Sequence, residues 1–318
     1  MRRVSPKEIL SNLVRTSDEL SLTAQFNLVT VYTKPQNLKR TCRMINVSKS
    51  SFELAQNIRQ HSLNMVHSGR ASHIGSALSI CDIVASLYGK VLNVDPSNPK
   101  WSDRDRFILS KGHACVAVYA ALAELGFISR ASLKSYGQDH SPLMNHISHK
   151  VPGVEFSTGS LGHGLPFGVG KAFAAKAGGH VWKTFVLLSD GELGEGSNWE
   201  AMMFAAHHEL NNLVAIVDYN KLQSLTTVDK TLGVEPLTDK FRAFGWAVQE
   251  VDGHDHLCIE ESLNSAPWQD SKPSILIAHT TKGKGVSFME NSVDWHYKCP
   301  DAQELAKALK EIEEVVNA

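Results

Sequence analysis

The chain has 318 residues, enough for one large domain, and its 32 basic and 33 acidic side chains nearly cancel. This balance argues against nucleic acid or an anionic membrane surface as a partner. No apolar run reaches the roughly 18 residues of a membrane span, and the five cysteines are too scattered for a zinc or redox motif. An odd number of scattered cysteines suits reduced thiols, so the composition predicts a soluble, cytoplasmic enzyme.

The N-terminal segment, residues 1–44, differs in composition from the rest of the chain. Its first 43 residues carry eight Lys and Arg against three acids and show little periodicity. A transit peptide has this basic, acid-poor composition, and the simpler alternative is an upstream start codon with the working protein beginning near Met44. We favour the second interpretation and expect one folded domain at residues 45–318.

From residue 50 onward, helical and strand patterns alternate along the chain. Helical periodicity predicts helices at 51–66, 76–91, 113–125, 164–176, 197–210 and 301–316. Short apolar runs predict buried strands at 107–109, 184–188, 213–217 and 274–278. Strands that alternate with helices of this length indicate an α/β fold, a doubly wound parallel sheet with helices on both faces. Ligands bind such folds at the carboxyl ends of the strands, so the residues that follow each strand are candidates for a site.

Two of these strands are followed by residues suited to a metal-bound diphosphate. Asp190 and Gly191 follow the second predicted strand, and Asn220 follows the third. If these strands are parallel neighbours, about 4.8 Å apart, the Asp190 carboxylate and the Asn220 amide project side by side from one sheet edge. Hard oxygen ligands suit Mg²⁺, while Gly191 and the start of the next helix would let backbone N–H groups approach a phosphate. Taken singly, a helix-capping Asp and a turn Asn explain the same residues.

This arrangement resembles the Gly-Asp-Gly…Asn motif of thiamine diphosphate enzymes, with Ser189 in place of the first Gly. Four further segments resemble the transketolase family in order and spacing. They are Ala-Ser-His-Ile-Gly-Ser at 71–76, Asp-Arg-Phe-Ile-Leu-Ser-Lys-Gly-His at 105–113, the run from Asn145-His146 to Gly164, and Thr-Thr-Lys-Gly-Lys-Gly at 280–285 with Trp295-His296 after it. The resemblance covers roughly residues 50–300 and implies the thiamine diphosphate-binding fold of the diphosphate-binding (PP) type.

The resemblance implies a role for each residue at a matched position. For Mg²⁺ it implies three ligands: Asp190, Asn220 and the backbone carbonyl of Leu222. For thiamine diphosphate it implies contacts from Ser76, His113, Gly159, Ser160, Leu161, Gly191, Asn220, Lys282 and His296. For catalysis on the sugar it implies His73, His113, His146 and His296. Glu195 and Glu200 match acids at the subunit interface between the family's paired active sites.

The chemistry of ketol transfer explains why such a site would use histidines. The donor is a polyhydroxylated sugar whose carbonyl becomes charged during attack, and imidazoles can donate to it, accept from hydroxyls and transfer protons near neutral pH. Any single histidine among the 15 is more simply a surface or core residue, but four inside matched segments favour a site. His254 and His256 are left unassigned, and Asp255 between them is expected to cap the next helix.

Besides Ser189, and Ser72 in place of a Gly, other positions depart from the family pattern. His163 stands where many members carry Gln, Ile74 replaces the Pro of the first histidine turn, and Tyr297 follows Trp-His where Gly is expected. By the resemblance, full-length transketolases continue into a second domain that supplies the glutamate activating the cofactor and the basic residues that bind the sugar phosphate. The chain therefore resembles the N-terminal subunit of a split transketolase. Such a subunit is expected to be active only in a heterotetramer with a C-terminal, pyrimidine-binding subunit.

Other functions stay open on the sequence. The glycines at 162, 164 and 168, followed by Asp190, have near the spacing of an NAD(P)-binding oxidoreductase, although such an enzyme would not need Asn220. A non-catalytic regulatory homologue is a further alternative, against which the retained Asp190, Asn220 and histidines argue. Among thiamine enzymes, the alternative acts on a 2-oxo acid such as pyruvate, as a deoxyxylulose phosphate synthase or a dehydrogenase α subunit does. The segments around His113 and His146 favour ketol transfer between (phospho)sugars.

Overall fold

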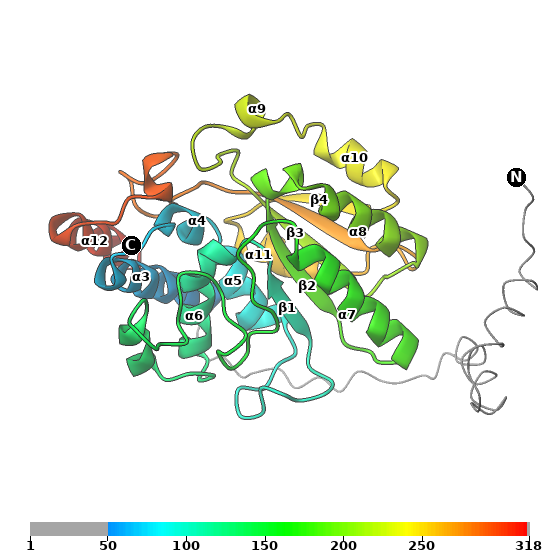
Figure 1. Cartoon of the computed structure of the whole chain (residues 1–318), viewed down its shortest axis with the longest axis horizontal. Helices are drawn as coiled ribbons and strands as arrows, with labels where there is room; N and C mark the ends of the chain where they lie inside the picture. The colour runs from blue at the N-terminus through cyan, green and yellow to red at the C-terminus, as the bar shows by residue number, and fades with distance from the viewer. Residues whose placement is uncertain (1–49, 317–318) are drawn as a thin grey trace, which may run out of the picture. The chain divides into compact units, whose positions relative to one another are not determined.

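The computed structural model describes residues 50–316, so the predicted extension at 1–44 lies outside the described residues. Within them, five strands form one parallel sheet in the order β1-β2-β3-β5-β4 (Figure 1). The strands are β1 (Arg106–Leu109), β2 (Thr184–Ser189), β3 (Leu213–Tyr219), β4 (Ala247–Asp252) and β5 (Ser274–His279). The doubly wound parallel sheet predicted from the sequence is confirmed.

Helices cover both faces of the sheet, because its strands are apolar on both sides. Phe185 and Leu187 of β2 pack into one hydrophobic cluster, and Val186 and Leu188 into the other. The first cluster takes side chains from α3 (Ser51–Gly69), α4 (Ile74–Ser79), α5 (Cys81–Ser86), α6 (Cys115–Glu124), α11 (His256–Ser265) and α12 (Ala302–Val316). The second takes side chains from α7 (Gly164–Gly178), α8 (Gly196–His207), α9 (Val228–Thr231) and α10 (Leu237–Ala243). Figure 1 shows α7 and α8 side by side over one face.

The register of β2 and β3 positions the predicted site. The two strands pair from Thr184 opposite Leu213 to Ser189 opposite Asp218. Both strands therefore end at the same edge of the sheet, and the residues that follow them are neighbours. This is the adjacency on which the predicted metal and diphosphate site depends.

Two elements differ from the sequence prediction. The edge strand β4 was missed, because the polar residues Gln249, Glu250 and Asp252 interrupt its apolar run, and only β5 pairs with it at this edge of the sheet. The helix predicted at 76–91 is divided at Ile80 into α4 and α5, and a π-helical turn follows at Leu87–Val91. The division separates Ser79, which bonds to the tip of β3, from Asp82, which bonds to α3.

No helix in the described part of the chain is long and apolar enough to cross a membrane. The cysteines at 81, 115, 258 and 299 carry free thiols. Asp255 caps α11 as predicted, since its carboxylate accepts the backbone N–H of Cys258 at 3.1 Å.

Candidate active site

The tips of β2 and β3 touch through the side chain of Asp190. Its Oδ1 accepts the N–H of Gly191 at 2.7 Å, and its Oδ2 accepts the N–H of Lys221 at 2.5 Å. Lys221 directly follows Asn220, whose Oδ1 accepts the N–H of Leu222 at 3.1 Å. The structure thus brings together the three residues predicted to bind Mg²⁺.

Asp190 is a buried carboxylate at the edge of the sheet. It is 1% exposed, and no Lys, Arg or His among residues 50–316 forms an ion pair with it. Burial, together with the nearby negative charge of Asp218, raises the pKa of Asp190 to about 7. A bound cation would relieve this cost, so the environment of Asp190 suits a metal ligand.

Asp218 organises the tip of β3 and was not recognised from the sequence. Its fully buried carboxylate accepts hydrogen bonds from Ser79 Oγ (2.6 Å), Thr280 Oγ1, Lys111 Nζ (2.5 Å) and Asn220 Nδ2 (2.9 Å). A carboxylate of this kind can only accept, so it fixes the amide of Asn220 with the NH₂ toward Asp218. The Asn220 Oδ1 therefore lies on the other side, where it accepts the N–H of Leu222.

Lys282 brings a positive charge to the same edge. Its Nζ donates to the carbonyl oxygens of Leu222 (3.3 Å) and Gln223 (2.8 Å) and lies 3.1 Å from His296 Nδ1. Burial and the charge of Lys111 lower the pKa of Lys282 to about 8. The Leu222 carbonyl predicted to bind metal is thus already turned toward a cation. Residues 50–316 contain no group of three or more His, Cys, Asp or Glu that could hold a metal ion, so a metal here would depend on amide and carbonyl oxygens beside the Asp190 carboxylate.

The four predicted catalytic histidines come together from four separate segments. The ring centre of His73 lies 5.1 Å from that of His113, 5.8 Å from His146 and 5.0 Å from His296. His113 and His296 are 5.5 Å apart. Tyr297, noted only as a departure from the family pattern, joins this cluster at 4.8 Å from His296. His146 and Tyr297 are exposed, so the cluster opens to the surface.

Backbone contacts fix the central histidine. His73 has a left-handed backbone (φ 73°), and its N–H donates to the carbonyl of His296 at 2.7 Å. Ser72 Oγ lies 3.0 Å from His73 Nδ1. The turn at 71–76 is therefore tied directly to the turn that carries His296.

The three half-buried histidines of the cluster are neutral at physiological pH. Burial, with the charges of His146 and Lys282, lowers the pKa of His73 to about 4. Burial and the charge of Lys282 lower the pKa of His296 to about 3. Burial likewise lowers the pKa of His113 well below its usual value. A neutral imidazole offers one donor and one acceptor, which suits contacts with sugar hydroxyls.

The loop at 158–162 borders the histidines through a close backbone contact. A Cβ on Gly112 would lie 2.3 Å from the carbonyl oxygen of Thr158, so only glycine fits before His113. A Cβ on Gly159 would lie 3.7 Å from the ring of His146. The other residues predicted to contact the cofactor are the buried Ser76, the exposed Ser160, and the half-buried Leu161 and Gly191.

Glu192 joins this loop to the sheet and was also missed. Its fully buried carboxylate accepts Ser110 Oγ at 2.5 Å and the Gly162 N–H at 2.8 Å through Oε1, and the Ser189 N–H at 3.3 Å through Oε2. It therefore ties the ends of β1 and β2 to the loop. Its position in the Asp-Gly-Glu motif was the available signal.

The predicted interface acids lie at the start of α8, where Glu195 adjoins Gly162 of the loop at 158–162. Glu195 directly precedes α8 and Glu200 lies on its first turns, and both side chains are exposed. His163, which departs from the family pattern, is exposed at the start of α7. The roles predicted for these residues stay predictions.

Comparison with known proteins gives the family. Residues 50–313 match the family described as transketolase, thiamine diphosphate binding domain. One relative is a subunit of the apulose-4-phosphate transketolase of Phocaeicola vulgatus, 43% identical over 256 residues that cover 80% of this chain and 91% of that protein. Another is the SqwG subunit of the 6-deoxy-6-sulfo-D-fructose transketolase of Clostridium sp., 40% identical over 241 residues that cover 75% of this chain and 87% of that protein.

A solved structure agrees with these relatives. The transketolase of Campylobacter jejuni superposes with a TM-score of 0.78 at 33% identity, covering 83% of this chain. The chain spans only 42% of that transketolase, while it spans most of the two subunit relatives. The chain therefore belongs to the transketolase family and corresponds to its thiamine diphosphate-binding half, as predicted from the sequence.

Proposed function

We propose that this chain is the cofactor-binding subunit of a Mg²⁺- and thiamine diphosphate-dependent transketolase, which transfers a two-carbon ketol unit between sugars or sugar phosphates. The observation that carries the proposal is the convergence of His73, His113 and His296, with ring centres 5.0–5.5 Å apart, beside the Lys282 ammonium. Ketol transfer needs neutral donors and acceptors around a polyhydroxylated substrate, next to a charge for the cofactor's diphosphate.

The metal would bind at the tips of β2 and β3. Asp190 supplies a buried carboxylate without a cationic partner among the described residues, Asn220 an amide oxygen oriented by Asp218, and Leu222 a backbone carbonyl. This set of hard oxygens suits Mg²⁺, which usually takes one or two protein ligands beside phosphate oxygens and water. Lys282 lies at the same edge and would add a positive charge for the diphosphate.

When bound, thiamine diphosphate would supply the nucleophilic carbon that attacks the ketose carbonyl. The protein's contribution is to hold the sugar in position and to stabilise charge on its oxygen. The imidazoles of His73 and His296 are neutral, because their pKa values are about 4 and about 3. Each neutral ring keeps one N–H that can donate a hydrogen bond to that oxygen. His146, at the exposed side of the cluster, would accept from a substrate hydroxyl.

The two subunit relatives point to the part of the substrate that this chain would recognise. One is named for a sugar phosphate and the other for a sulfo sugar, so they act on sugars with different anionic ends. What these sugars share is the hydroxylated end that undergoes ketol transfer. We therefore assign the histidines to that shared end and the anionic end to the partner subunit.

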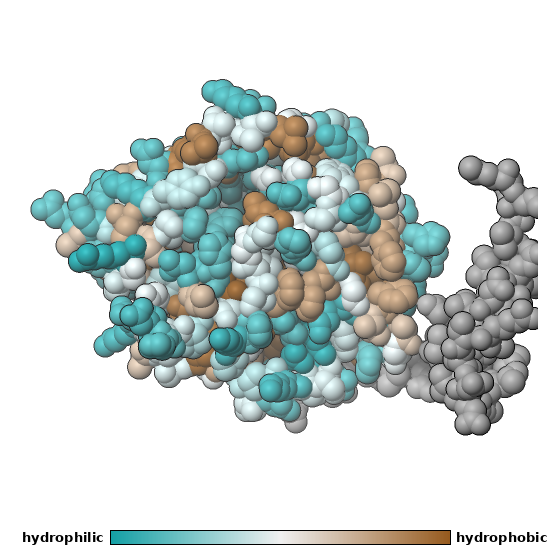
Figure 2. Space-filling model, in the orientation of Figure 1, coloured by the Kyte–Doolittle hydropathy of each residue, from teal (hydrophilic) through white to brown (hydrophobic). Residues whose placement is uncertain are grey.

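The partner would be a C-terminal, pyrimidine-binding subunit, in a heterotetramer located in the cytoplasm. The outer face of α8 supports an interface, because Glu200, Met203 and Phe204 lie three and four residues apart and are all exposed. Phe204 also contacts Phe173 of α7, with ring centres 5.6 Å apart. Figure 2 shows apolar residues gathering over α7 and α8, as expected for a surface that another chain covers.

The proposal is tested first by binding. The purified chain is titrated with thiamine diphosphate in saturating Mg²⁺ and, separately, with NADPH, and heat release is recorded. Binding of thiamine diphosphate that disappears with EDTA supports the proposal, and binding of NADPH alone would overturn it. Adding the C-terminal subunit should then produce ketol transfer from a ketose phosphate to an aldose phosphate, which neither protein catalyses alone.

A further inference from the structure

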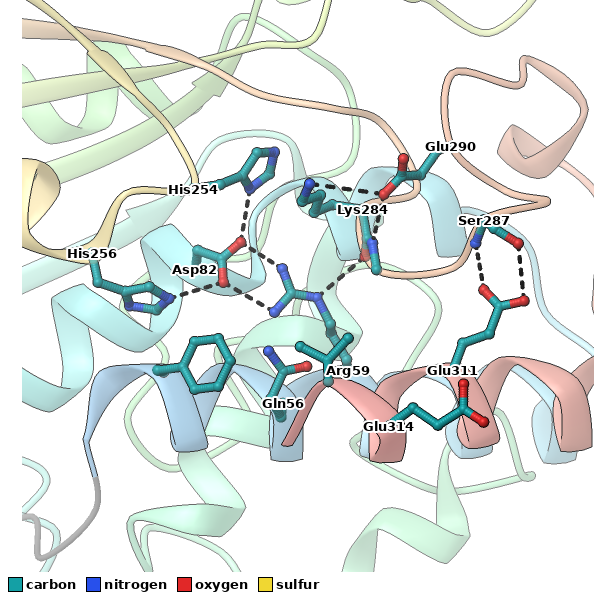
Figure 3. Close-up of a pocket in the computed structure, with 13 residues that line it drawn as sticks. Gln56, Arg59, Asp82, His254, His256, Lys284, Ser287, Glu290, Glu311 and Glu314 are labelled. Carbon is teal, nitrogen blue, oxygen red and sulfur yellow. Dashed lines mark hydrogen bonds and ion pairs between the residues drawn. The ribbon is translucent and has the colours of Figure 1, made fainter. Parts of the chain in front are cut away.

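A second cluster of charged side chains lies beside the candidate active site, centred on Asp82 of α5 (Figure 3). Its buried carboxylate accepts both Nη groups of Arg59 (3.0 and 2.5 Å), Nδ1 of His254 (2.7 Å) and Nε2 of His256 (3.1 Å). The cluster borders a cavity of about 630 Å³ that is also lined by residues of α12 and of the loop at 284–290. No residue of this cluster has a role in the proposed function.

The hydrogen bonds of this cluster fix the tautomer of His254. Burial would raise the pKa of Asp82, but the Arg59 charge and the hydrogen bonds from His254 and His256 hold it well below its usual value. An ionised carboxylate only accepts, so His254 Nδ1 carries a hydrogen. The N–H of Thr281 donates to His254 Nε2 at 2.8 Å, so this second nitrogen is an acceptor. His254 is therefore a neutral imidazole in one tautomer, assigned from its hydrogen bonds.

The same cluster holds the backbone on both sides of Lys282. Thr281, bound by His254, directly precedes Lys282. Arg59 Nε donates to the carbonyl of Lys284, two residues after Lys282, at 3.2 Å. The loop borders a cavity on this side, so packing alone does not fix its backbone there. Hydrogen bonds therefore contribute more to holding the backbone in place.

We infer that His254, held by Asp82 and Arg59, is a positioning residue that sets the backbone before Lys282 and so aims its ammonium at the cofactor's diphosphate. The inference rests on the proposed function, in which Lys282 faces that diphosphate. The Lys282 Nζ lies 2.8 Å from the Gln223 carbonyl and 3.1 Å from His296 Nδ1, so a small shift of its backbone would move the charge away from both.

His256 provides a matched control. It contacts the same carboxylate as His254, and both imidazoles are 14% exposed, but its second ring nitrogen faces Ser86 on α5 instead of the loop that carries Lys282. We expect His254→Ala to weaken thiamine diphosphate binding in saturating Mg²⁺ roughly 5- to 20-fold, because a half-buried N–H loses its acceptor. His256→Ala should change binding by less than about twofold, while both variants lose similar thermal stability.

Two further comparisons separate positioning from a general loss of structure. In a Lys282→Met background, His254→Ala should weaken binding no further, because the network acts through Lys282. His254→Gln can present an amide oxygen near the Nε2 position and accept from Thr281, whereas His254→Asn keeps only the donor to Asp82. Binding should therefore be closer to wild type in the Gln variant than in the Asn variant.

The measurement is isothermal titration of the full chain with thiamine diphosphate, with Mg²⁺ in excess. Equal effects of His254→Ala and His256→Ala, or additive effects of His254→Ala and Lys282→Met, would overturn the inference while leaving the proposed function intact. If the wild-type chain binds no thiamine diphosphate with Mg²⁺ present, with or without its partner subunit, the proposed function and the inference both fail.

Discussion

The ion pair between Lys111 and Asp218 gives the sharpest prediction about stability. Lys111 is 1% exposed and Asp218 fully buried, with Nζ and Oδ2 2.5 Å apart. In Asp218→Asn, the new NH₂ can face the hydroxyls of Ser79 and Thr280, which accept as well as donate, while its oxygen faces Lys111 and Asn220. The hydrogen bonds survive, so the variant loses mainly the negative charge. A buried charge left without its partner costs about 3–5 kcal/mol, and we expect this loss of unfolding free energy.

Thermal and urea unfolding of the full chain measure this cost. A loss of about 3–5 kcal/mol corresponds to a fall in Tm of roughly 6–20 °C for a domain of this size. Adding Lys111→Met should restore most of the loss, because replacing both partners of a buried pair by neutral groups is nearly neutral. The reasoning is refuted if Asp218→Asn stays within about 1 kcal/mol of wild type, or if the double variant is no more stable than Asp218→Asn alone.

Other predictions concern the metal, pH and assembly. Asp190→Ala should abolish Mg²⁺-dependent thiamine diphosphate binding in calorimetry, and binding unchanged from wild type would reject the metal site. The variant should not lower the Tm of the chain measured in EDTA, because it removes a buried carboxyl group whose pKa is about 7. The pKa of His296 is about 3 when folded and near 6.5 when unfolded, so the unfolded state binds more protons and stability falls as pH drops from 6.5 toward 3. His296→Phe should therefore show a smaller fall in Tm between pH 7 and 5 in differential scanning fluorimetry, and a slope equal to wild type would contradict this. Met203→Glu on α8 should weaken assembly in analytical ultracentrifugation, while Leu257→Glu, on the exposed side of α11, should not; equal effects would argue against an interface on α8.

The fold was predictable where local pattern decides it. The apolar runs of β2 and β3 are buried on both faces, and a parallel sheet then brings the residues after them to one edge. That reasoning predicted that Asp190 and Asn220 would lie side by side, and Asp190 does accept the N–H of Lys221, the residue after Asn220. β4 was missed because Gln249 and Glu250 lie on an exposed edge strand, where burial imposes no apolar pattern.

The histidine cluster and its supports were predictable to different degrees. His73, His113, His146 and His296 match family segments, so the resemblance named them although spacing alone could not bring four distant segments together. Lys111 pairs with Asp218 across 107 positions, and nothing local indicates such a partner. Supporting residues of this kind become visible only once the fold is known.

The Asp-Gly-Glu motif shows how structure separates a candidate metal ligand from a structural support within three residues. Asp190 and Glu192 are both buried carboxylates, and burial raises the pKa of each. Glu192 bonds to Ser110 and Gly162, so its oxygens face inward and join two strands to a loop. Asp190 bonds only to backbone N–H groups at the adjoining strand tips and has no cationic partner within residues 50–316. Of the two acids, Asp190 has the position at the strand tips that the proposed metal site requires, and Glu192 is held inside by Ser110 and Gly162, which a motif match alone does not decide.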